Sequence, residues 1–319
     1  MAFAPDLAAR RPLGATGLPV TSVCIGGSPL GSMPAVLGYE TPEERGVATV
    51  LAAFDSPFGF IDTSAGYSDG ESERRIGLAI AQAGGLPPGW VLETKVDPDW
   101  ETGQFDGPAV RRVFEGSLRR LGLDHIELLH LHDPEFQDFD FLTGPGGALA
   151  EMIKLRDEGL VSHLGVAGGR SSVLLRYLEL GVFEAVLTHN RYTLADRSAE
   201  PVIARATELG LGVLNAAPFG GGVLSRGSQA DGKYCYRPMT PPTRAVIERI
   251  EAICAAAGVP LGAAALQFSL REPRIHSTVV GVSRPERIQQ TQDWATWPIP
   301  DDVWQAILDA SGRDAGLAN

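Results

Sequence analysis

The chain alternates between short apolar runs and longer segments with helical periodicity. The apolar runs occupy residues 22–27, 58–62, 90–96, 125–132, 161–167, 184–190, 211–218 and 275–282. The helical patterns that follow them occupy residues 42–55, 72–83, 108–122, 147–159, 171–181, 199–210, 243–258 and 285–294. The runs are short and rich in β-branched residues, which is typical of strands that are buried on both faces. Eight such pairs predict a (β/α)8 TIM barrel that forms a single domain over residues 1–319.

Two further segments lie outside this repeat. Residues 10–20 predict a β-hairpin with Gly14 and Gly17 in its turn, and we expect the hairpin to close the bottom of the barrel, at the N-terminal ends of the strands. Residues 261–272 predict an additional helix before the last strand. The alternative fold is a doubly wound open sheet, which usually carries a G-x-G-x-x-G turn after its first strand. The segment GGSPLGS at 26–32 does not match that turn.

The composition is that of a globular protein with an excess of acidic residues. Of the 319 residues, 44% are hydrophobic and 21% are charged, and the net charge is −12. This charge disfavours nucleic acid and anionic membranes as partners, and no apolar stretch has the length of a membrane span or of a signal peptide. Cys24, Cys235 and Cys254 form no C-x-x-C pair, which fits a reducing compartment. We therefore expect a cytoplasmic protein that acts on a small-molecule substrate as a monomer or small homo-oligomer.

Four side chains suited to acid–base chemistry follow or end three successive predicted strands. They are Asp62, Tyr67, Lys95 and His132. Functional groups of a TIM barrel lie at the carboxyl ends of its strands, so we expect these four to converge at the barrel mouth. The reference pKa of tyrosine is about 10, and a nearby Lys95 ammonium is expected to lower the pKa of Tyr67. Asp62 would hold Lys95, and His132 would orient a substrate oxygen and share its proton.

A second histidine competes for the role of His132. His130 and His132 lie two residues apart on one strand, so both face the barrel interior. His132 is nearer the carboxyl end, and we assign catalysis to His132 and core packing to His130. Glu93 faces inward with Lys95 by the same parity, and a buried carboxylate needs a partner. We expect Glu93 to contact either His130 or Lys95.

The motifs around these residues resemble the aldo-keto reductase superfamily over nearly the whole chain. They are LGATGLPVTSVCIGGSPLG, FIDTSAGYSDGESERRIGLAI, VLETKV, LLHLHDPE, APFGGGVLS and VVGVSRPERI. The resemblance places the catalytic tetrad of the family on Asp62, Tyr67, Lys95 and His132, with Tyr67 as proton donor or acceptor. Within the superfamily, the chain most resembles the group of the L-fucose (D-threo-aldose) 1-dehydrogenases, L-galactose dehydrogenases and pyridoxal 4-dehydrogenases.

The resemblance also implies a nicotinamide dinucleotide bound across the barrel mouth without a Rossmann motif. The residues it implies as cofactor contacts are Gly27, Ser28, Ala167, Gly168, His189, Asn190, Pro218, Phe219, Gly220, Gly281, Ser283, Arg287 and Gln290. Two positions depart from the common family pattern: Ala167-Gly168 stands where many members have Ser-Asn, and Ala216 where many have a stacking aromatic. Many members that prefer NADP have Lys-Ser where this chain has Gly281-Val282, so NAD is the expected cofactor. Arg284 and Arg287 are left to bind the phosphate of NADP. No metal site is expected.

The group resemblance implies a cyclic hemiacetal substrate whose oxidation at C1 gives a lactone. Tyr39, Trp100 and Tyr192 lie in predicted loops on the mouth side and are expected to pack against the substrate ring. An aldose and pyridoxal both remain open as substrates at this point. A general aldehyde or ketone reductase is the next alternative. A cofactor-binding sensor without turnover is a third, which the complete tetrad disfavours.

Overall fold

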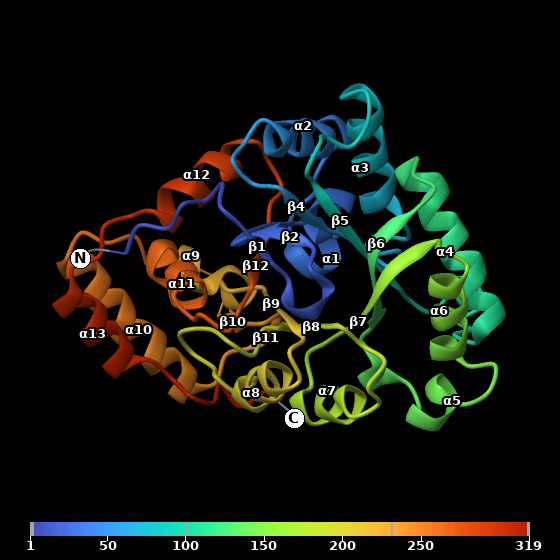
Figure 1. Ribbon diagram of the computed structural model, residues 1–319. Helices are drawn as coiled ribbons and strands as arrows, with labels where there is room; N and C mark the ends of the chain where they lie inside the picture. Colours follow the sequence, from blue (N-terminus) through green and yellow to red (C-terminus); the bar gives the residue numbers. More distant parts are fainter. Residues whose placement is uncertain (1–2, 100, 231, 318–319) are drawn as a thin grey trace.

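A computed structural model, which describes residues 3–99, 101–230 and 232–317, shows a closed barrel of eight parallel strands surrounded by helices (Figure 1). In order around the barrel the strands are β12 (Ser277–Gly281), β3 (Val23–Gly26), β4 (Phe60–Asp62), β5 (Val91–Val96), β6 (Ile126–His132), β7 (Val161–Gly168), β8 (Ala185–His189) and β9 (Gly212–Ala216). Each overlaps one predicted apolar run. The predicted (β/α)8 barrel is confirmed.

The predicted helices are also present. Those that follow the barrel strands in chain order are α2 (Glu43–Phe54), α3 (Glu71–Gln82), α4 (Gly107–Leu121), α6 (Ala148–Asp157), α7 (Ser171–Leu178), α8 (Glu200–Glu208), α10 (Pro241–Ala256) and α12 (Glu286–Ala295). The additional helix before the last strand is α11 (Leu261–Leu270). Asp106 caps α4 by accepting a hydrogen bond from the amide of Ala109, and Gly122 ends that helix in a left-handed conformation.

Several short elements were not predicted from the sequence. They are α1 (Pro34–Leu37), α5 (Phe139–Thr143), α9 (Val223–Arg226), the strand pair β10 (Lys233–Tyr234) and β11 (Arg237–Pro238), and the 3-10 turns η1 (Gly14–Thr16), η2 (Ser28–Gly31), η3 (Pro134–Phe136) and η4 (Gly220–Gly222). Elements of two to five residues are too short to show a hydrophobic period. The last helix, α13 (Asp301–Ala310), is longer and was also missed.

The N-terminal hairpin closes the bottom of the barrel, as predicted. Its strands β1 (Arg10–Pro12) and β2 (Pro19–Thr21) lie across the barrel centre in Figure 1. Leu13 and Val20 have no exposed surface and pack among residues from the lower ends of the barrel strands, namely Cys24, Phe60, Val91, Leu128 and Leu214. A Cβ atom at Gly14 would lie 2.2 Å from the backbone nitrogen of Gly212, so only glycine allows this approach.

The barrel register brings the polar interior residues into adjacent rows. Asp62 on β4 pairs with Glu93 on β5, and Lys95 on β5 pairs with His130 on β6. One pair farther along, His132 lies beside Ala167 of β7. The interior is therefore apolar near the hairpin and charged toward the carboxyl ends of the strands.

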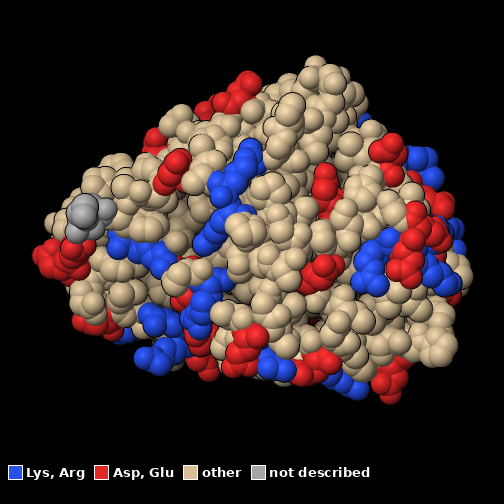
Figure 2. Space-filling view, in the orientation of Figure 1, with Lys and Arg blue, Asp and Glu red and all other residues tan. Residues whose placement is uncertain are grey.

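The outer surface mixes both signs of charge. On the face seen in Figure 2, acidic and basic side chains are interspersed. On α4 and α6, Arg111 forms ion pairs with both Glu151 and Glu158. Among the helices of the described residues, no single one has the length and apolar character of a membrane span. The pair α10 and α11 meets that test only when counted together, across a bend of 107°.

Candidate active site

A buried ion pair forms the base of the site. The Lys95 side chain at the end of β5 is fully buried, and its ammonium donates hydrogen bonds to Asp62 Oδ1, to the Thr63 carbonyl at 2.7 Å and to the Tyr67 hydroxyl at 3.2 Å. A lysine ammonium has three donors, so all of them are used. Lys95 is therefore held in place beneath the phenol of Tyr67.

The pKa values in this group follow from burial and mutual charge. Burial raises the pKa of Asp62 to about 6, although the Lys95 charge acts in the opposite direction. Burial alone would lower the pKa of Lys95, but the negative groups around it, first Asp62, outweigh this and raise it. Burial raises the pKa of Tyr67 above its usual value, and Lys95 only reduces that rise. The predicted lowering by the Lys95 charge is present, but loss of water around the phenol outweighs it, so the pKa of Tyr67 is raised in the free protein.

The imidazole of His132 completes the group of four. Its ring lies edge-on to the ring of Tyr67, with centroids 5.7 Å apart. Its Nδ1 atom lies 2.6 Å from Asp97 Oδ1 and 3.2 Å from Ser64 Oγ. Burial lowers the pKa of His132, but the charges of Asp97 and Asp133 outweigh burial and raise it. The structure thus brings Asp62, Tyr67, Lys95 and His132 together at the carboxyl ends of β4, β5 and β6.

His130 and Glu93 form a separate pair below this group. Both side chains are fully buried, and His130 Nε2 lies 3.0 Å from Glu93 Oε2. Burial raises the pKa of Glu93 to about 7 and lowers the pKa of His130 to about 3. The imidazole is therefore neutral near pH 7. The predicted contact of Glu93 with His130 and the core position of His130 are confirmed.

A cluster of carboxylate and imidazole groups lies on the other side of His132. His189 Nε2 lies 2.9 Å from Asp133 Oδ1, and Glu135 Oε1 accepts hydrogen bonds from the amides of Gly169 and Arg170 just before α7. Possible ligand atoms of Asp133, Glu135 and His189 lie within 4.8 Å of one another. The sequence predicts no metal here, and these hydrogen bonds give each of the three groups a protein partner.

Three residues directly after barrel strands have left-handed backbone conformations without being glycine. They are Asp133 after β6, with φ of 44°, Asn190 after β8, with φ of 65°, and Ala217 after β9, with φ of 58°. Such conformations are unfavourable for residues with a Cβ atom and are concentrated at functional sites in proteins. Asn and Asp tolerate this conformation, so among these three residues the strain falls on Ala217.

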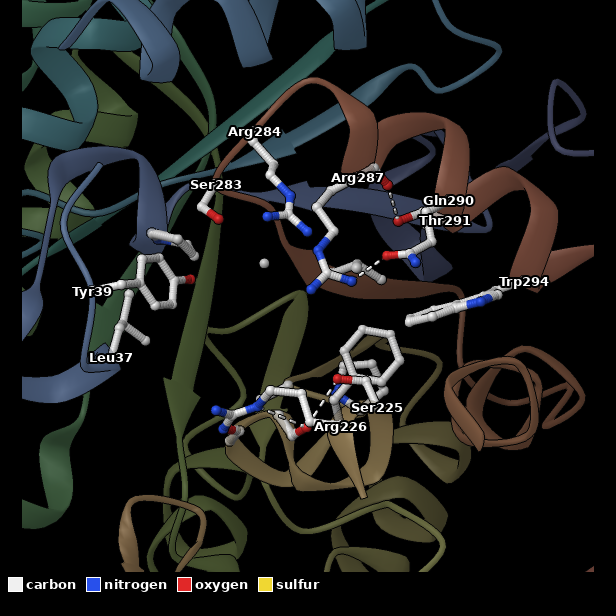
Figure 3. Close-up of a pocket in the computed structure, with 18 of the residues that line it drawn as sticks. Leu37, Tyr39, Ser225, Arg226, Ser283, Arg284, Arg287, Gln290, Thr291 and Trp294 are labelled. Carbon is white, nitrogen blue, oxygen red and sulfur yellow. Dashed lines mark hydrogen bonds between the residues drawn. The ribbon is translucent and has the colours of Figure 1, made fainter. Parts of the chain in front are cut away.

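A cavity of about 440 Å³ opens beside the mouth, between the loops after β9 and β12 and helix α12. Of the predicted cofactor contacts, its lining includes Pro218, Phe219, Gly281, Ser283, Arg287 and Gln290. Figure 3 shows Arg284 and Arg287 on one side of the cavity and Arg226 on another. Burial lowers the pKa of Arg287, and the charges of Arg284 and Arg226 lower it further. This end of the cavity therefore favours an anion.

The other predicted cofactor contacts lie outside this lining. Gly27, Ser28, Ala167, Gly168, His189 and Asn190 lie at or just after the ends of β3, β7 and β8, and Gly220 packs against the ring of Tyr234. At Gly168 a Cβ atom would lie 2.6 Å from Glu135 Oε2. The Oδ1 atom of Asn190 is buried and has no hydrogen-bond partner among the described residues. The unused acceptor of Asn190 at the end of β8 and the arginine-lined cavity fit the carboxamide and the phosphates of a nicotinamide dinucleotide.

The predicted substrate residues have different surroundings from those expected. Tyr192 is buried outside the barrel, where its ring stacks on Phe268 of α11 at 5.1 Å and its hydroxyl donates to Glu272 at 3.0 Å. Its loop turns outward because Asn215 holds the Tyr192 carbonyl at 2.9 Å. Tyr39 lines the cavity that contains Arg226, Arg284 and Arg287, here called the arginine cavity (Figure 3). Its lining contains none of the tetrad residues. Trp100 lies outside the described residues.

Three residues of this region were not predicted from the sequence. Asp97 and Ser64 contact the imidazole of His132, and Arg226 adds to the arginine cavity. Asp97 had a signal, because it lies two residues after Lys95 and shares its inward parity. Ser64 and Arg226 lie in loops, where no periodicity marks a direction.

A (β/α)8 barrel with acid–base residues at its mouth and an arginine-lined cavity beside them suits an oxidoreductase that uses a nicotinamide dinucleotide. The model of the aldo/keto reductase family matches residues 22–311, and the chain belongs to this family. The predicted resemblance is confirmed.

Curated relatives cover most of this chain. It is 31% identical to the D-threo-aldose 1-dehydrogenase of a Pseudomonas species, over 93% of this chain and 95% of that protein. It is 29% identical to the L-galactose dehydrogenase of Arabidopsis thaliana, over 88% of this chain and 86% of the relative. It is also 29% identical to the pyridoxal 4-dehydrogenase of Microbacterium luteolum, over 93% and 96%.

Solved structures share the fold. An aldo-keto reductase from Bacillus halodurans, in its holo form, superposes with a TM-score of 0.76 over 95% of this chain and 96% of that one, at 22% identity. The glycerol dehydrogenase of Gluconobacter oxydans gives a TM-score of 0.72 over 96% and 95%, at 21% identity. Aldo-keto reductases use a nicotinamide cofactor, so the chain is an oxidoreductase of that kind.

Proposed function

We propose that this protein is an NAD(P)-dependent dehydrogenase that oxidises a cyclic hemiacetal at C1 to a lactone. The proposed substrate is an aldose such as L-fucose, L-galactose or D-arabinose. The observation that carries the proposal is the convergence of Tyr67, Lys95 and His132 at one end of the barrel. The names of two relatives, a D-threo-aldose 1-dehydrogenase and an L-galactose dehydrogenase, support the substrate class.

Residues of this chain would bind and transfer the proton of the substrate hydroxyl. A bound nicotinamide supplies the acceptor for the hydride that leaves C1. Tyr67 acts as acid or base at the substrate oxygen, and the Lys95 ammonium, 3.2 Å from the phenol oxygen, favours the ionised phenol. His132 binds the same oxygen and shares its proton. General acid–base assistance of this kind contributes about 10²–10⁴-fold in rate.

The surroundings of Asp133 support a substrate with several hydroxyl groups. Its Oδ1 atom accepts a hydrogen bond from His189 and lies 3.9 Å from His132 Nε2, and its side chain is 31% exposed. A carboxylate has about four acceptor positions, and its neighbours leave some of them open. Burial would raise the pKa of Asp133, but His132 and His189 outweigh it and hold that pKa below its usual range. An ionised acceptor beside the reacting oxygen suits the hydroxyl donors of a sugar.

The arginine cavity supports NADP as a cofactor alongside NAD. The absence of a lysine at Gly281 favours NAD, as the sequence predicts. Arg226, Arg284 and Arg287 nevertheless line one cavity, and their mutual repulsion would be relieved by a phosphate dianion. We assign the adenosine end of the dinucleotide to this cavity.

Pyridoxal is the second candidate substrate, because a pyridoxal 4-dehydrogenase matches 93% of the chain. The test is a panel of L-fucose, L-galactose, D-arabinose and pyridoxal, each with NAD and with NADP, followed by the absorbance of the reduced cofactor. Turnover of the sugars is the expected result, with the lactone identified by mass spectrometry. Turnover of pyridoxal alone would replace the aldose proposal. Absence of turnover with all four compounds would favour the reductase direction, which is tested with aldehydes and NADPH.

A further inference from the structure

Asp97 has a geometrically restricted position at the mouth, with hydrogen bonds to both carboxylate oxygens. Its Oδ1 atom lies 2.6 Å from His132 Nδ1, while its Oδ2 atom accepts hydrogen bonds from Ser64 Oγ and from the Gly66 amide at 2.8 Å. A Cβ atom at residue 66 would lie 2.7 Å from the Asp97 carboxyl carbon. Only glycine at that position lets the carboxylate approach the backbone. The loop after β4 therefore fixes the carboxylate that contacts His132.

This contact determines which nitrogen of His132 carries the permanent proton. Burial raises the pKa of Asp97, but His132 and the hydrogen bonds from Ser64 and Gly66 outweigh it and hold that pKa below its usual value. An ionised carboxylate only accepts hydrogen bonds, so His132 Nδ1 must donate. In the neutral ring Nε2 is then a bare acceptor, and in the charged ring Nε2 is a donor.

The other ionisable groups around the imidazole lie on β4, β5, β6 and β8 and in the loops after β4 and β6. Lys95 and His130 act against a charged His132, and Asp133 favours it. Tyr67 contacts the ring edge-on, Asp62 pairs with Lys95, and His189 binds Asp133. Of these groups, only Asp97 accepts a hydrogen bond from Nδ1. The tautomer of His132 therefore depends on Asp97 alone among the charged neighbours.

We propose that Asp97 is a positioning residue that holds the proton of His132 at Nδ1, so that Nε2 takes up the proton of the substrate hydroxyl. The inference rests on the proposed dehydrogenase function. In the oxidation, the O–H bond of the hemiacetal breaks and its proton ends on Nε2, directly or through Tyr67. The C1 hydride leaves with its electron pair to the nicotinamide. The resulting imidazolium is paired with the Asp97 carboxylate.

The first test measures the imidazole directly and needs no turnover. Long-range ¹H–¹⁵N spectra of the whole protein, labelled at histidine nitrogen, report the tautomer and pKa of each ring, and His132→Gln identifies the signals of residue 132. We expect an Nδ1–H tautomer in the unmodified protein and a lower pKa in Asp97→Asn. The matched control is Asp99→Asn, which removes a carboxylate that binds Arg112 and nearby backbone amides of the same loop. An Nε2–H tautomer, or an unchanged pKa in Asp97→Asn, would overturn the proposal.

The second test is the pH profile of the oxidation. Because neutral His132 is the acceptor, kcat rises with pH through the pKa of His132. We expect Asp97→Asn to shift this limb to lower pH and to reduce kcat at least about tenfold, with a smaller change in KM. Asp99→Asn should keep the original limb. An unchanged limb in Asp97→Asn would contradict the role of Asp97. If the unmodified protein oxidises no member of the panel, the dehydrogenase proposal fails, and the spectra alone decide whether Asp97 sets the tautomer.

Discussion

The two ends of the barrel interior are built from the same eight strands and differ in almost every other respect. At the bottom, Leu13 and Val20 of the hairpin pack among apolar side chains with no exposed surface. At the mouth, Asp62, Lys95 and His132 are buried as charged or titratable groups. Burial of apolar area stabilises the bottom end. At the mouth, burial of charged groups costs desolvation free energy, and the same groups carry out the acid–base chemistry.

The fold therefore separates the residues that stabilise it from those that carry its activity. Backbone register gives both ends the same geometry, since side chains alternate inward and outward along each strand. Only the residue types differ. At the mouth, burial disfavours the charged forms of Asp62 and Glu93 and raises their pKa values. If the separation is real, substitutions at one end should leave the property of the other end nearly unchanged.

The largest expected effect is that of Tyr67→Phe. Removal of the hydroxyl takes away the acid–base group at the substrate oxygen, so turnover should fall by about 10²–10⁴-fold. Dinucleotide binding should change little, because the lining of the arginine cavity does not include Tyr67. Steady-state kinetics and cofactor fluorescence titration measure the two properties. Unchanged turnover in Tyr67→Phe would contradict the acid–base role of Tyr67.

Leu13→Ala tests the opposite end. The side chain is fully buried in the bottom cluster, and such truncations cost about 2–5 kcal/mol of unfolding free energy. Denaturant unfolding should show this loss, while kcat at a temperature well below the transition should stay within about twofold of the original value. A parallel loss of kcat would show that the two ends of the barrel are coupled.

Glu93→Gln sharpens the boundary between the two ends. Because the pKa of Glu93 in the folded state is about 7, above its usual value of 4.5, the folded protein holds this proton more tightly than the unfolded chain. Its contribution to stability is complete below pH 4.5 and is lost as the pH rises toward 7. Over that window the unmodified protein should lose about 1–3 kcal/mol relative to Glu93→Gln. The same pH dependence of thermal unfolding in the two proteins would contradict the raised pKa of Glu93. Both proteins retain His130, so its titration is present in each.

Arg284→Ala should have the smallest effect. The exposed guanidinium faces the cavity, so its loss should raise the KM for NADP by about tenfold through one lost charge-assisted contact, with the KM for NAD nearly constant. The NAD measurement is the internal control. Equal changes in KM for NAD and NADP would contradict the assignment of the NADP phosphate to this cavity.

The sequence predicted the barrel and the convergence of the four acid–base residues because both depend on local signals. Apolar runs and helical periods mark the elements, and strand parity directs Lys95 and His132 to the same interior. The contact of Asp97 with His132 could not be predicted in the same way, since it depends on the lateral register of β5 and β6 and on the turn at Gly66. Tyr192 was misplaced because a loop has no period to show that it turns outward.

The net shift at Tyr67 also had no sequence signal. The charge of Lys95 can be recognised from its place in the chain, but the loss of water around the phenol depends on every loop that covers it. Burial of a loop side chain is a property of the whole fold. The sequence therefore predicts the effect of the neighbouring charge but not the burial that outweighs it.

The left-handed residues at the mouth have a consequence for attempts to change what the enzyme accepts. Asp133, Asn190 and Ala217 follow three barrel strands and would be obvious positions to randomise. Asn, Asp and Gly tolerate this backbone conformation, whereas other side chains add about 1–2 kcal/mol of strain. A library at these positions would mostly select for foldability, and losses of activity there would be mistaken for losses of recognition. Diversity is better introduced at neighbouring loop residues with ordinary backbone angles, where a new side chain changes only what it touches.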